Sequence, residues 1–251
     1  MGKNAGMSPT PPAFLPDPAD GRVYAARKIV RSTDVTPDGR LRLEALARYL
    51  QVAAEDDLAD SGLLGPAVWL VRRCAIAVRG FPRMGERITL RTFCSGTGPR
   101  WAERTTTVAG PAGDLLQATA VWAAVDRASG RPVAPGEKVL AVYAKAAQGR
   151  VVSARLSHPR PERTAVGRPW QLRTTDFDTA GHVNNAIHWA VVEDLLADSG
   201  WLPTGAEMEY HRPILPGCMP RLVTAAIGHQ PALWLLDGQH VLASARLTQR
   251  G

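Results

Sequence analysis

Cysteine is scarce in this chain, and its spacing argues against two classes of protein. Three cysteines occur among 251 residues, at positions 74, 94 and 218, and they form neither a Cys-x-x-Cys pair nor a Cys/His ligand spacing. Disulfide-stapled domains and zinc modules depend on such spacings. We therefore expect neither a disulfide framework nor a metal site.

Long apolar runs are also missing. No window approaches the ~18 consecutive apolar residues that a membrane helix needs. Residues 1–20 carry five prolines, at positions 9, 11, 12, 16 and 18, where a secretory signal would have an apolar core. We interpret this segment as a disordered, proline-rich leader on a cytoplasmic protein that has no membrane partner.

Acidic residues are in the minority, with 23 Asp and Glu against 30 Lys and Arg, which gives a net charge of +7. Such a balance suits an acidic partner, for example nucleic acid, an acidic carrier protein or a phosphorylated cofactor. Codon bias explains the excess of basic residues equally well, because the arginines are spread evenly along the chain. No run of five Lys or Arg occurs, so we expect no nucleic-acid partner.

An internal duplication decides the domain organisation. The sequence EDDLADSG at residues 55–62 recurs as EDLLADSG at residues 193–200. Upstream, residues 33–35 and 39–41 match residues 175–177 and 181–183 after a shift of four positions. The hydrophobic content of 45% is sufficient for a core. The length of 251 residues is compatible with one domain or with two. The duplication indicates two copies of one unit that fold together.

Each copy predicts the same order of elements. An extended stretch (23–33; 170–175) leads through a turn to a long helix (about 42–61; about 183–199) that ends at Gly62 or Gly200 in a left-handed cap. Four strands follow, at 68–78, 87–93, 100–108 and 115–125 in the first copy and at 206–211, 221–227, 232–236 and 241–248 in the second. Hairpin turns are expected at 110–113 and 237–238.

These elements predict an α+β fold of two long central helices, each wrapped by an antiparallel sheet, with the two sheets joined edge to edge. The expected boundaries are a leader at 1–20, an N-terminal unit at 21–126, a linker at 127–166 and a C-terminal unit at 167–251. A short helix is expected within the linker at 138–147.

The two copies differ most at the turn before the helix. In the alignment of the two copies, Asp178 corresponds to Thr36, and His182 corresponds to Arg40. Because only the second copy keeps ionisable groups suited to catalysis, we expect one active centre, in the C-terminal unit. A helix N-terminus there would supply unpaired N–H groups for an oxyanion, beside a carboxylate and an imidazole.

A structural interpretation competes with this one. Asp178 could be a helix cap, His182 an interface residue, and Asn184 and Asn185 could bond to the loop. Each structural role is favoured for a residue taken singly. The catalytic interpretation is favoured for the group, because the group occurs in one copy only.

The run Asp-Phe-Asp-Thr-Ala-Gly-His-Val-Asn-Asn at residues 176–185, followed by Trp189 and Glu193, resembles the hot-dog thioesterases. The double length resembles the fatty acyl-ACP thioesterase family, which has two hot-dog domains per chain. Further matches are residues 50–54, 69–72, 81–86 and 121–122 in the first half, and 209–217 in the second.

The resemblance implies hydrolysis of the thioester between a fatty acyl chain and acyl carrier protein (ACP), without metal or cofactor. It also implies that Asp178 and His182 are the catalytic pair. Ala180 stands where the family commonly has Asn, and Pro213 and Ile214 stand where plant members have Glu and Cys. A plant-like Asn/His/Cys scheme therefore does not transfer.

Our hypothesis is that Asp178 activates water or attacks the thioester carbonyl directly, while His182 orients or protonates. Backbone N–H groups of Gly181, His182 and Val183 would hold the oxyanion, and Asn184 or Asn185 would position water or the pantetheine amide. Glu193 lies three helical turns from His182, and we expect it to have a structural role between the two helices. Cys218 is expected to be an ordinary turn residue.

Two other functions stay open. A hot-dog hydratase or dehydratase would act on hydroxyacyl or enoyl thioesters, although its Asp-x-Asn-Pro-x-His pattern is not present here. A non-catalytic acyl-binding protein would bind thioesters without cleaving them. For the thioesterase we expect ACP as partner and either a monomeric pseudo-dimer or a homodimer. Arginines 72, 73, 79, 83, 212 and 221 are candidates for contact with the acidic carrier.

Overall fold

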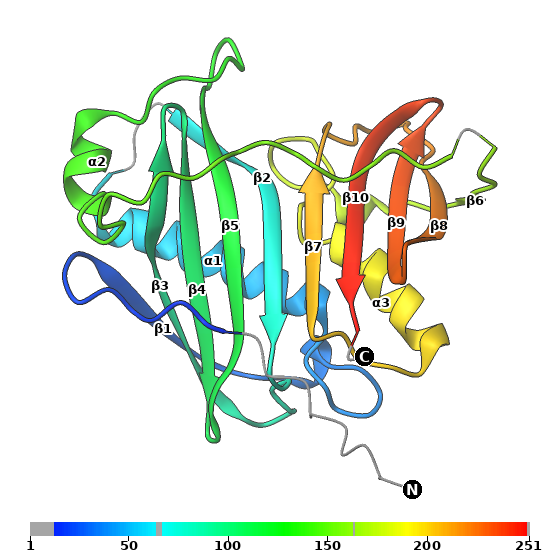
Figure 1. Ribbon diagram of the computed structural model, residues 1–251, viewed down its shortest axis with the longest axis horizontal. Coiled ribbons are helices and arrows are strands. Elements are labelled where there is room, and N and C mark those ends of the chain that lie inside the picture. Colours follow the sequence, from blue (N-terminus) through cyan, green and yellow to red (C-terminus); the bar gives the residue numbers. More distant parts are fainter. Residues whose placement is uncertain (1–12, 64–66, 163, 250–251) are drawn as a thin grey trace, which may run out of the picture.

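The computed structural model describes residues 13–63, 67–162 and 164–249. Within them, one antiparallel sheet of 10 strands curves around two long helices, α1 and α3, which lie on the same face (Figure 1). The strands are β1 (Val23–Ile29), β2 (Ala67–Val78), β3 (Arg87–Gly98), β4 (Trp101–Gly110), β5 (Gly113–Asp126), β6 (Arg168–Pro169), β7 (Gly205–Tyr210), β8 (Arg221–Ile227), β9 (Gln230–Asp237) and β10 (His240–Thr248). The helices are η1 (Ser32–Asp34), α1 (Leu43–Asp60), α2 (Glu137–Tyr143), η2 (Thr174–Asp176) and α3 (His188–Ser199).

The strand order records the duplication. It is β1-β3-β4-β5-β2 followed by β7-β10-β9-β8-β6, so the second half repeats the first in reverse around the junction of β2 and β7. Antiparallel pairing of Arg73 with Glu209 and of Ala77 with Gly205 joins the two halves at that junction. The predicted α+β fold with sheets joined edge to edge is therefore confirmed.

Both long helices end where the glycines predict. Gly62 and Gly200 have φ values of +70° and +69°, the left-handed conformation that a residue without a Cβ adopts at low cost. The predicted hairpin turns also hold, since Gly110–Gly113 joins β4 to β5 and Asp237 pairs with His240 between β9 and β10.

Two predicted starts are wrong. The second helix begins at His188 rather than near Val183, because the Asn184 side chain accepts the Ala186 N–H (2.9 Å) and the chain turns tightly before the helix begins. The extended stretch expected at 170–175 contains no strand, because the two-residue strand β6 ends just before it at Pro169 and the 3-10 helix η2 begins at Thr174. The C-terminal unit consequently has a shorter helix and a much shorter first strand than the N-terminal unit.

Asp57 explains the single mismatch within the repeated octapeptide. Its carboxylate is 1% exposed and pairs with Arg22 (2.7 Å) and with Arg104 on β4 (2.7 Å). The equivalent residue in the C-terminal unit, Leu195, packs against the main core. One position thus anchors α1 by charge and α3 by apolar contact.

The linker crosses the face of the sheet that is opposite the helices (Figure 1). On the N-terminal unit, Arg150 pairs with Glu103 on β4, and Trp101 Nε1 donates to Val152 O (2.8 Å). The short helix expected in the linker is present as α2. The linker therefore covers polar side chains that both units direct away from the helices.

Part of the expected leader, residues 1–12, lies outside the described residues. Its remainder contacts the N-terminal unit. Leu15 N–H donates to Gln117 Oε1 (2.7 Å), Asp17 pairs with Arg91 (2.6 Å) and the Phe14 ring faces the Arg79 guanidinium (3.7 Å). Residues 13–20 are thus held against the sheet. Among the described residues, no helix is both long and apolar enough to span a membrane.

Candidate active site

The predicted catalytic residues lie on a tight turn that precedes α3. Phe177 and Val183 form an antiparallel bridge, Asp178 N–H donates to His182 O (2.9 Å) and Gly181 N–H donates to Asp178 O (3.0 Å). Gly181 has a φ of +75°, which closes the turn. The turn therefore brings the backbones of Asp178 and His182 together, and both side chains are partly exposed.

Asp178 has a local bond and a free acceptor. Its Oδ1 accepts the Ala180 N–H (2.9 Å), a turn of the kind that Asp commonly makes. Its Oδ2 accepts no hydrogen bond from the described part of the chain. One oxygen is thus used to hold the turn, and the other is open to water or substrate.

The expected oxyanion donors are only partly available. The N–H groups of Gly181 and Val183 donate to Asp178 O and to Ile214 O (2.9 Å), so both are engaged. Because α3 begins at His188, the turn does not stand directly at a helix N-terminus, and that part of the expectation is wrong. Among the described residues, the N–H groups of His182 and Asn185 have no acceptor, so they are the donors that remain.

Asn184 and Asn185 shape the approach to the helix. Asn184 N–H donates to the carbonyl of Asp176 (2.8 Å), and Asn185 O accepts from the Tyr210 hydroxyl (3.2 Å). Tyr210 in turn accepts from Trp189 Nε1 (3.0 Å). The Asn184 side chain accepts the Ala186 N–H (2.9 Å), so it has the structural role that was the alternative to a catalytic one in the sequence analysis.

Two buried aromatic residues support the turn and were not singled out from the sequence. The His188 ring lies 5.2 Å from the Tyr210 ring, and its Nδ1 lies 3.2 Å from Asn184 O. Burial lowers the pKa of His188 to about 4 and raises that of Tyr210 well above its ordinary value. Both residues are therefore neutral near pH 7. Tyr210 lies within the stretch 209–217 that resembles the thioesterase family, whereas His188 lies in none of the matched segments.

The corresponding turn of the N-terminal unit has the same backbone but carries Thr36 and Arg40 in place of the acid and the imidazole. Its own carboxylate, Asp38, lies at the position of Ala180 and pairs with Arg83 (3.2 Å). Val35 bridges Leu41, Gly39 has a φ of +84°, and Leu41 N–H donates to Pro82 O (2.9 Å). Arg40, which replaces His182, is buried and binds Glu193. The expected structural role of Glu193 between the helices is confirmed.

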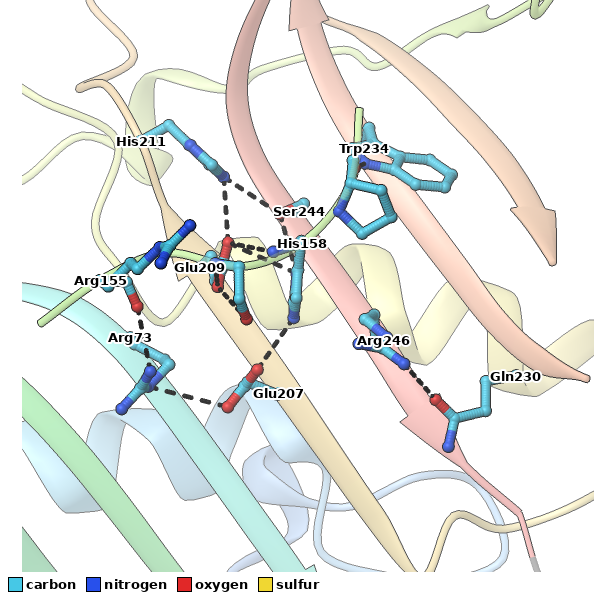
Figure 2. Close-up of polar contacts among 12 residues, drawn as sticks. Arg73, Arg155, His158, Glu207, Glu209, His211, Gln230, Trp234, Ser244 and Arg246 are labelled. Atoms are coloured by element: carbon cyan, nitrogen blue, oxygen red, sulfur yellow. Dashed lines mark hydrogen bonds and ion pairs between the residues drawn. The ribbon is translucent and has the colours of Figure 1, made fainter. Parts of the chain in front are cut away.

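A second polar cluster lies where the linker crosses β7 and β10 (Figure 2). Strand alternation directs Met208 and Tyr210 toward the helices and Glu207 and Glu209 toward the linker. Glu209 is fully buried and accepts the N–H groups of Ser157 (2.5 Å) and His158 (3.1 Å).

His158 is the centre of that cluster. Its Nδ1 lies 2.9 Å from Ser244 Oγ and its Nε2 lies 3.0 Å from Glu207 Oε1. A cavity of about 230 Å³, lined in part by His211 and Arg212, lies beside it.

The potential ligand atoms of His158, Glu207 and Glu209 all lie within 4.8 Å of one another, the spacing that a metal ion requires. Arg73 lies 3.7 Å from Glu207, however, and backbone N–H groups already occupy Glu209. These contacts satisfy the carboxylates without a cation. The cluster therefore fixes the linker to the sheet.

Residues 21–143 match the model of the acyl-ACP thioesterase N-terminal domain. The family resemblance found in the sequence is thereby confirmed, and the matched region extends through α2.

Relatives match a larger part of the chain than the family model does. Two uncharacterized proteins of Mycobacterium tuberculosis, from strains CDC 1551 and H37Rv, are each 29% identical over 209 residues, covering 82% of this chain and 83% of theirs. The palmitoyl-acyl carrier protein thioesterase of Gossypium hirsutum chloroplasts is 26% identical over 126 residues, which is 45% of this chain and 30% of that protein.

Solved structures of acyl-ACP thioesterases share the fold of nearly the whole chain. The 12:0-ACP thioesterase of Umbellularia californica superposes with a TM-score of 0.76 at 22% identity, covering 91% of this chain and 97% of that one. An acyl-ACP thioesterase of Bacteroides thetaiotaomicron gives 0.76 at 17% identity, covering 90% and 97%. The double hot-dog architecture is therefore established for both units together.

Proposed function

We propose that this protein hydrolyses the thioester of an acyl-ACP and releases the free acid. The family domain in the N-terminal unit and the shared double fold support thioester hydrolysis. The observation that supports a particular active site is a difference between the two equivalent turns that precede the long helices. Only the C-terminal one has a carboxylate and an imidazole, Asp178 and His182, with one carboxylate oxygen free.

In the proposed reaction, Asp178 acts on the thioester carbonyl in one of two ways. Its free Oδ2 removes a proton from a water that attacks the carbonyl carbon, or it attacks that carbon itself and water then hydrolyses the acyl-enzyme anhydride. The C–S bond breaks in either case, and the departing thiolate takes a proton from His182 or from water. The products of the hydrolysis are a carboxylic acid and the free thiol of the carrier.

The backbone N–H groups of His182 and Asn185 are the proposed donors to the oxyanion, because they have no acceptor in the described part of the chain. Removal of one such donor in other enzymes costs about a hundredfold or more in rate. Gly181 and Val183 are proposed to act indirectly, by fixing the turn. Of the two asparagines considered for positioning water or the pantetheine amide, Asn184 accepts the Ala186 N–H through its Oδ1, so Asn185 is the one proposed for that role.

The proposal is tested by measuring thiol release from acyl-ACP and acyl-CoA substrates of several chain lengths. Wild-type protein is expected to release thiol from acyl-ACP, and Asp178→Ala and His182→Ala are each expected to lower kcat. Unchanged turnover by Asp178→Ala would remove this site from the mechanism. Water addition to an enoyl thioester without thiol release would identify a hydratase, and binding without either reaction would identify an acyl-binding protein.

A further inference from the structure

A groove lies beside the candidate catalytic turn, between the segment that leads to η2 and the loop that precedes β8. Its volume is about 740 Å³. It is lined by Pro169, Trp170, Gln171, Leu172, Arg173, Thr174 and Phe177 on one side and by residues 216–220 on the other. Phe177 is the residue immediately before Asp178, so the groove ends at the turn that carries the proposed catalytic pair.

The groove has its origin in two matched extensions. In the N-terminal unit, Val30 N–H donates to Glu86 O (3.0 Å), and in the C-terminal unit the equivalent bond joins Trp170 N–H to Pro220 O (2.8 Å). From this bond to the following 3-10 helix, the chain advances two residues in the N-terminal unit, to Ser32, and four in the C-terminal unit, to Thr174.

The facing loop is longer by the same amount. The carbonyls that bind Leu41 and Val183 belong to Pro82 and Ile214. Glu86 follows Pro82 by four residues, whereas Pro220 follows Ile214 by six. Both walls of the groove are therefore extended only in the unit that carries Asp178 and His182, which indicates a role tied to that site.

The lining is amphipathic and open to solvent. Trp170, Leu172, Phe177 and Cys218 pack against the main core and form an apolar floor. Met219, which is 85% exposed, and the exposed Arg173 border it. Such a groove suits a ligand with an apolar body, polar amides and a negative end better than a purely apolar chain, which gains most from full enclosure.

We propose that this groove holds the phosphopantetheine arm of the thioester substrate, with the phosphate beside Arg173. The assignment rests on the proposed function and names the part of the substrate that occupies this site. Arg presents a planar set of donors that matches a phosphate group, and Arg168 and Arg221, both exposed on the paired strands β6 and β8, add positive charge nearby.

The duplication supplies a matched control for Arg173. Arg31 has the same place before η1 that Arg173 has before η2, and both side chains are exposed. Arg173→Glu and Arg31→Glu therefore make the same change of charge at equivalent positions. Both variants are compared on dodecanoyl-CoA, which contains phosphopantetheine, and on the dodecanoyl thioester of N-acetylcysteamine, which keeps the acyl chain and thioester but lacks the phosphate.

Arg173→Glu is expected to raise KM for dodecanoyl-CoA about tenfold with kcat little changed, because one phosphate contact is replaced by repulsion. It is expected to leave the KM for the N-acetylcysteamine thioester unchanged, and Arg31→Glu is expected to leave both values unchanged. Equal effects of Arg173→Glu and Arg31→Glu on dodecanoyl-CoA, or an unchanged KM in Arg173→Glu, would overturn the assignment.

A binding measurement keeps this test separate from the proposed catalysis. Cys218 lines the groove, whereas Cys74 and Cys94 are buried, so alkylation by iodoacetamide is followed at Cys218 by mass spectrometry. S-dodecyl-CoA, a thioether that cannot be hydrolysed, is expected to slow this alkylation about fivefold at about four times its Kd.

S-dodecyl-N-acetylcysteamine is expected to give no protection in the same experiment. Equal protection by both thioethers would assign the groove to the acyl chain, and protection by neither would leave it outside the substrate site. Either result refutes the proposal. Protection by the CoA thioether alone, in a protein that releases no thiol, would retain the binding site and refute the hydrolase function.

Discussion

Arg40 and Glu193 join the two units through a buried, two-point ion pair. Arg40 Nη2 lies 2.6 Å from Glu193 Oε2 and Nη1 lies 3.1 Å from Oε1, with side chains 7% and 12% exposed. Glu193 also accepts the N–H of Leu43 at the start of α1. The residue that replaced the imidazole in the N-terminal turn thus holds α1 against α3.

Glu193→Gln is expected to lower the free energy of unfolding by about 3 kcal/mol, because it leaves the buried Arg40 without a counter-charge. Urea unfolding followed by tryptophan fluorescence measures the change. The matched control is Glu55→Gln, since Glu55 is the equivalent residue of α1 but is exposed and bonds only to Gln51 among the described residues. Equal losses in the two variants would contradict the role assigned to the pair.

The repeat in the sequence predicted the mirrored sheet, because equivalent sequences form equivalent strands and the free edges of two such units can pair. It also contained the explanation for the short second helix. The turns are offset by 142 residues and the helix ends by 138, so the C-terminal unit has four fewer residues in between. These four residues account for most of the difference in helix length, since α3 has 12 residues and α1 has 18; the rest arises because α3 begins seven residues after Gly181, whereas α1 begins four after Gly39.

Other features could not be predicted from the sequence. Glu209 and His158 are 51 residues apart, and no periodic pattern links a buried acid on a strand to a backbone N–H in a proline-rich linker. The groove depends on two extensions of two residues each, which become visible only when equivalent hydrogen bonds fix the alignment. The sequence predicted that Asp178 and His182 lie together on the turn before the second long helix, whereas the bonds that occupy the N–H groups of Gly181 and Val183 depend on the folded structure.

Asp178→Asn is expected to lower kcat for acyl-ACP by about a hundredfold or more while leaving the fold intact, because the amide oxygen can still accept the Ala180 N–H but can no longer act as base or nucleophile. Thiol release and the urea midpoint are measured on the same preparation. Thr36→Val, at the equivalent position of the N-terminal turn, serves as the control and is expected to keep its activity. A loss of stability that parallels the loss of activity would argue for a purely structural Asp178.

His188 makes stability depend on pH. Burial lowers its pKa to about 4, whereas in the unfolded chain its pKa is near 6.5, the ordinary value for histidine. Below about pH 6.5 the unfolded state therefore binds a proton that the folded state does not, so stability falls as pH decreases toward 4. The loss from this group between pH 7.5 and pH 5 is expected to be about 2 kcal/mol.

Denaturant unfolding at both pH values measures that loss. His188→Phe is expected to reduce the pH dependence by the same amount, whereas His229→Gln, a change at an exposed histidine, is expected to leave it unchanged. An identical pH dependence in wild type and His188→Phe would show that His188 is not the titrating group.

Glu209 is expected to control the attachment of the linker. Glu209→Ala removes the acceptor for the N–H groups of Ser157 and His158, while Trp234 Nε1 still donates to Pro159 O (2.9 Å). Limited trypsin digestion is expected to cleave this variant faster after Arg155, and the free energy of unfolding is expected to fall by about 2 to 3 kcal/mol. Glu162→Ala removes an exposed carboxylate from the same linker and is expected to digest at the wild-type rate. Because the linker spans both units, faster cleavage in Glu209→Ala with unchanged thiol release would mean that the linker stabilises the sheet without shaping the active site.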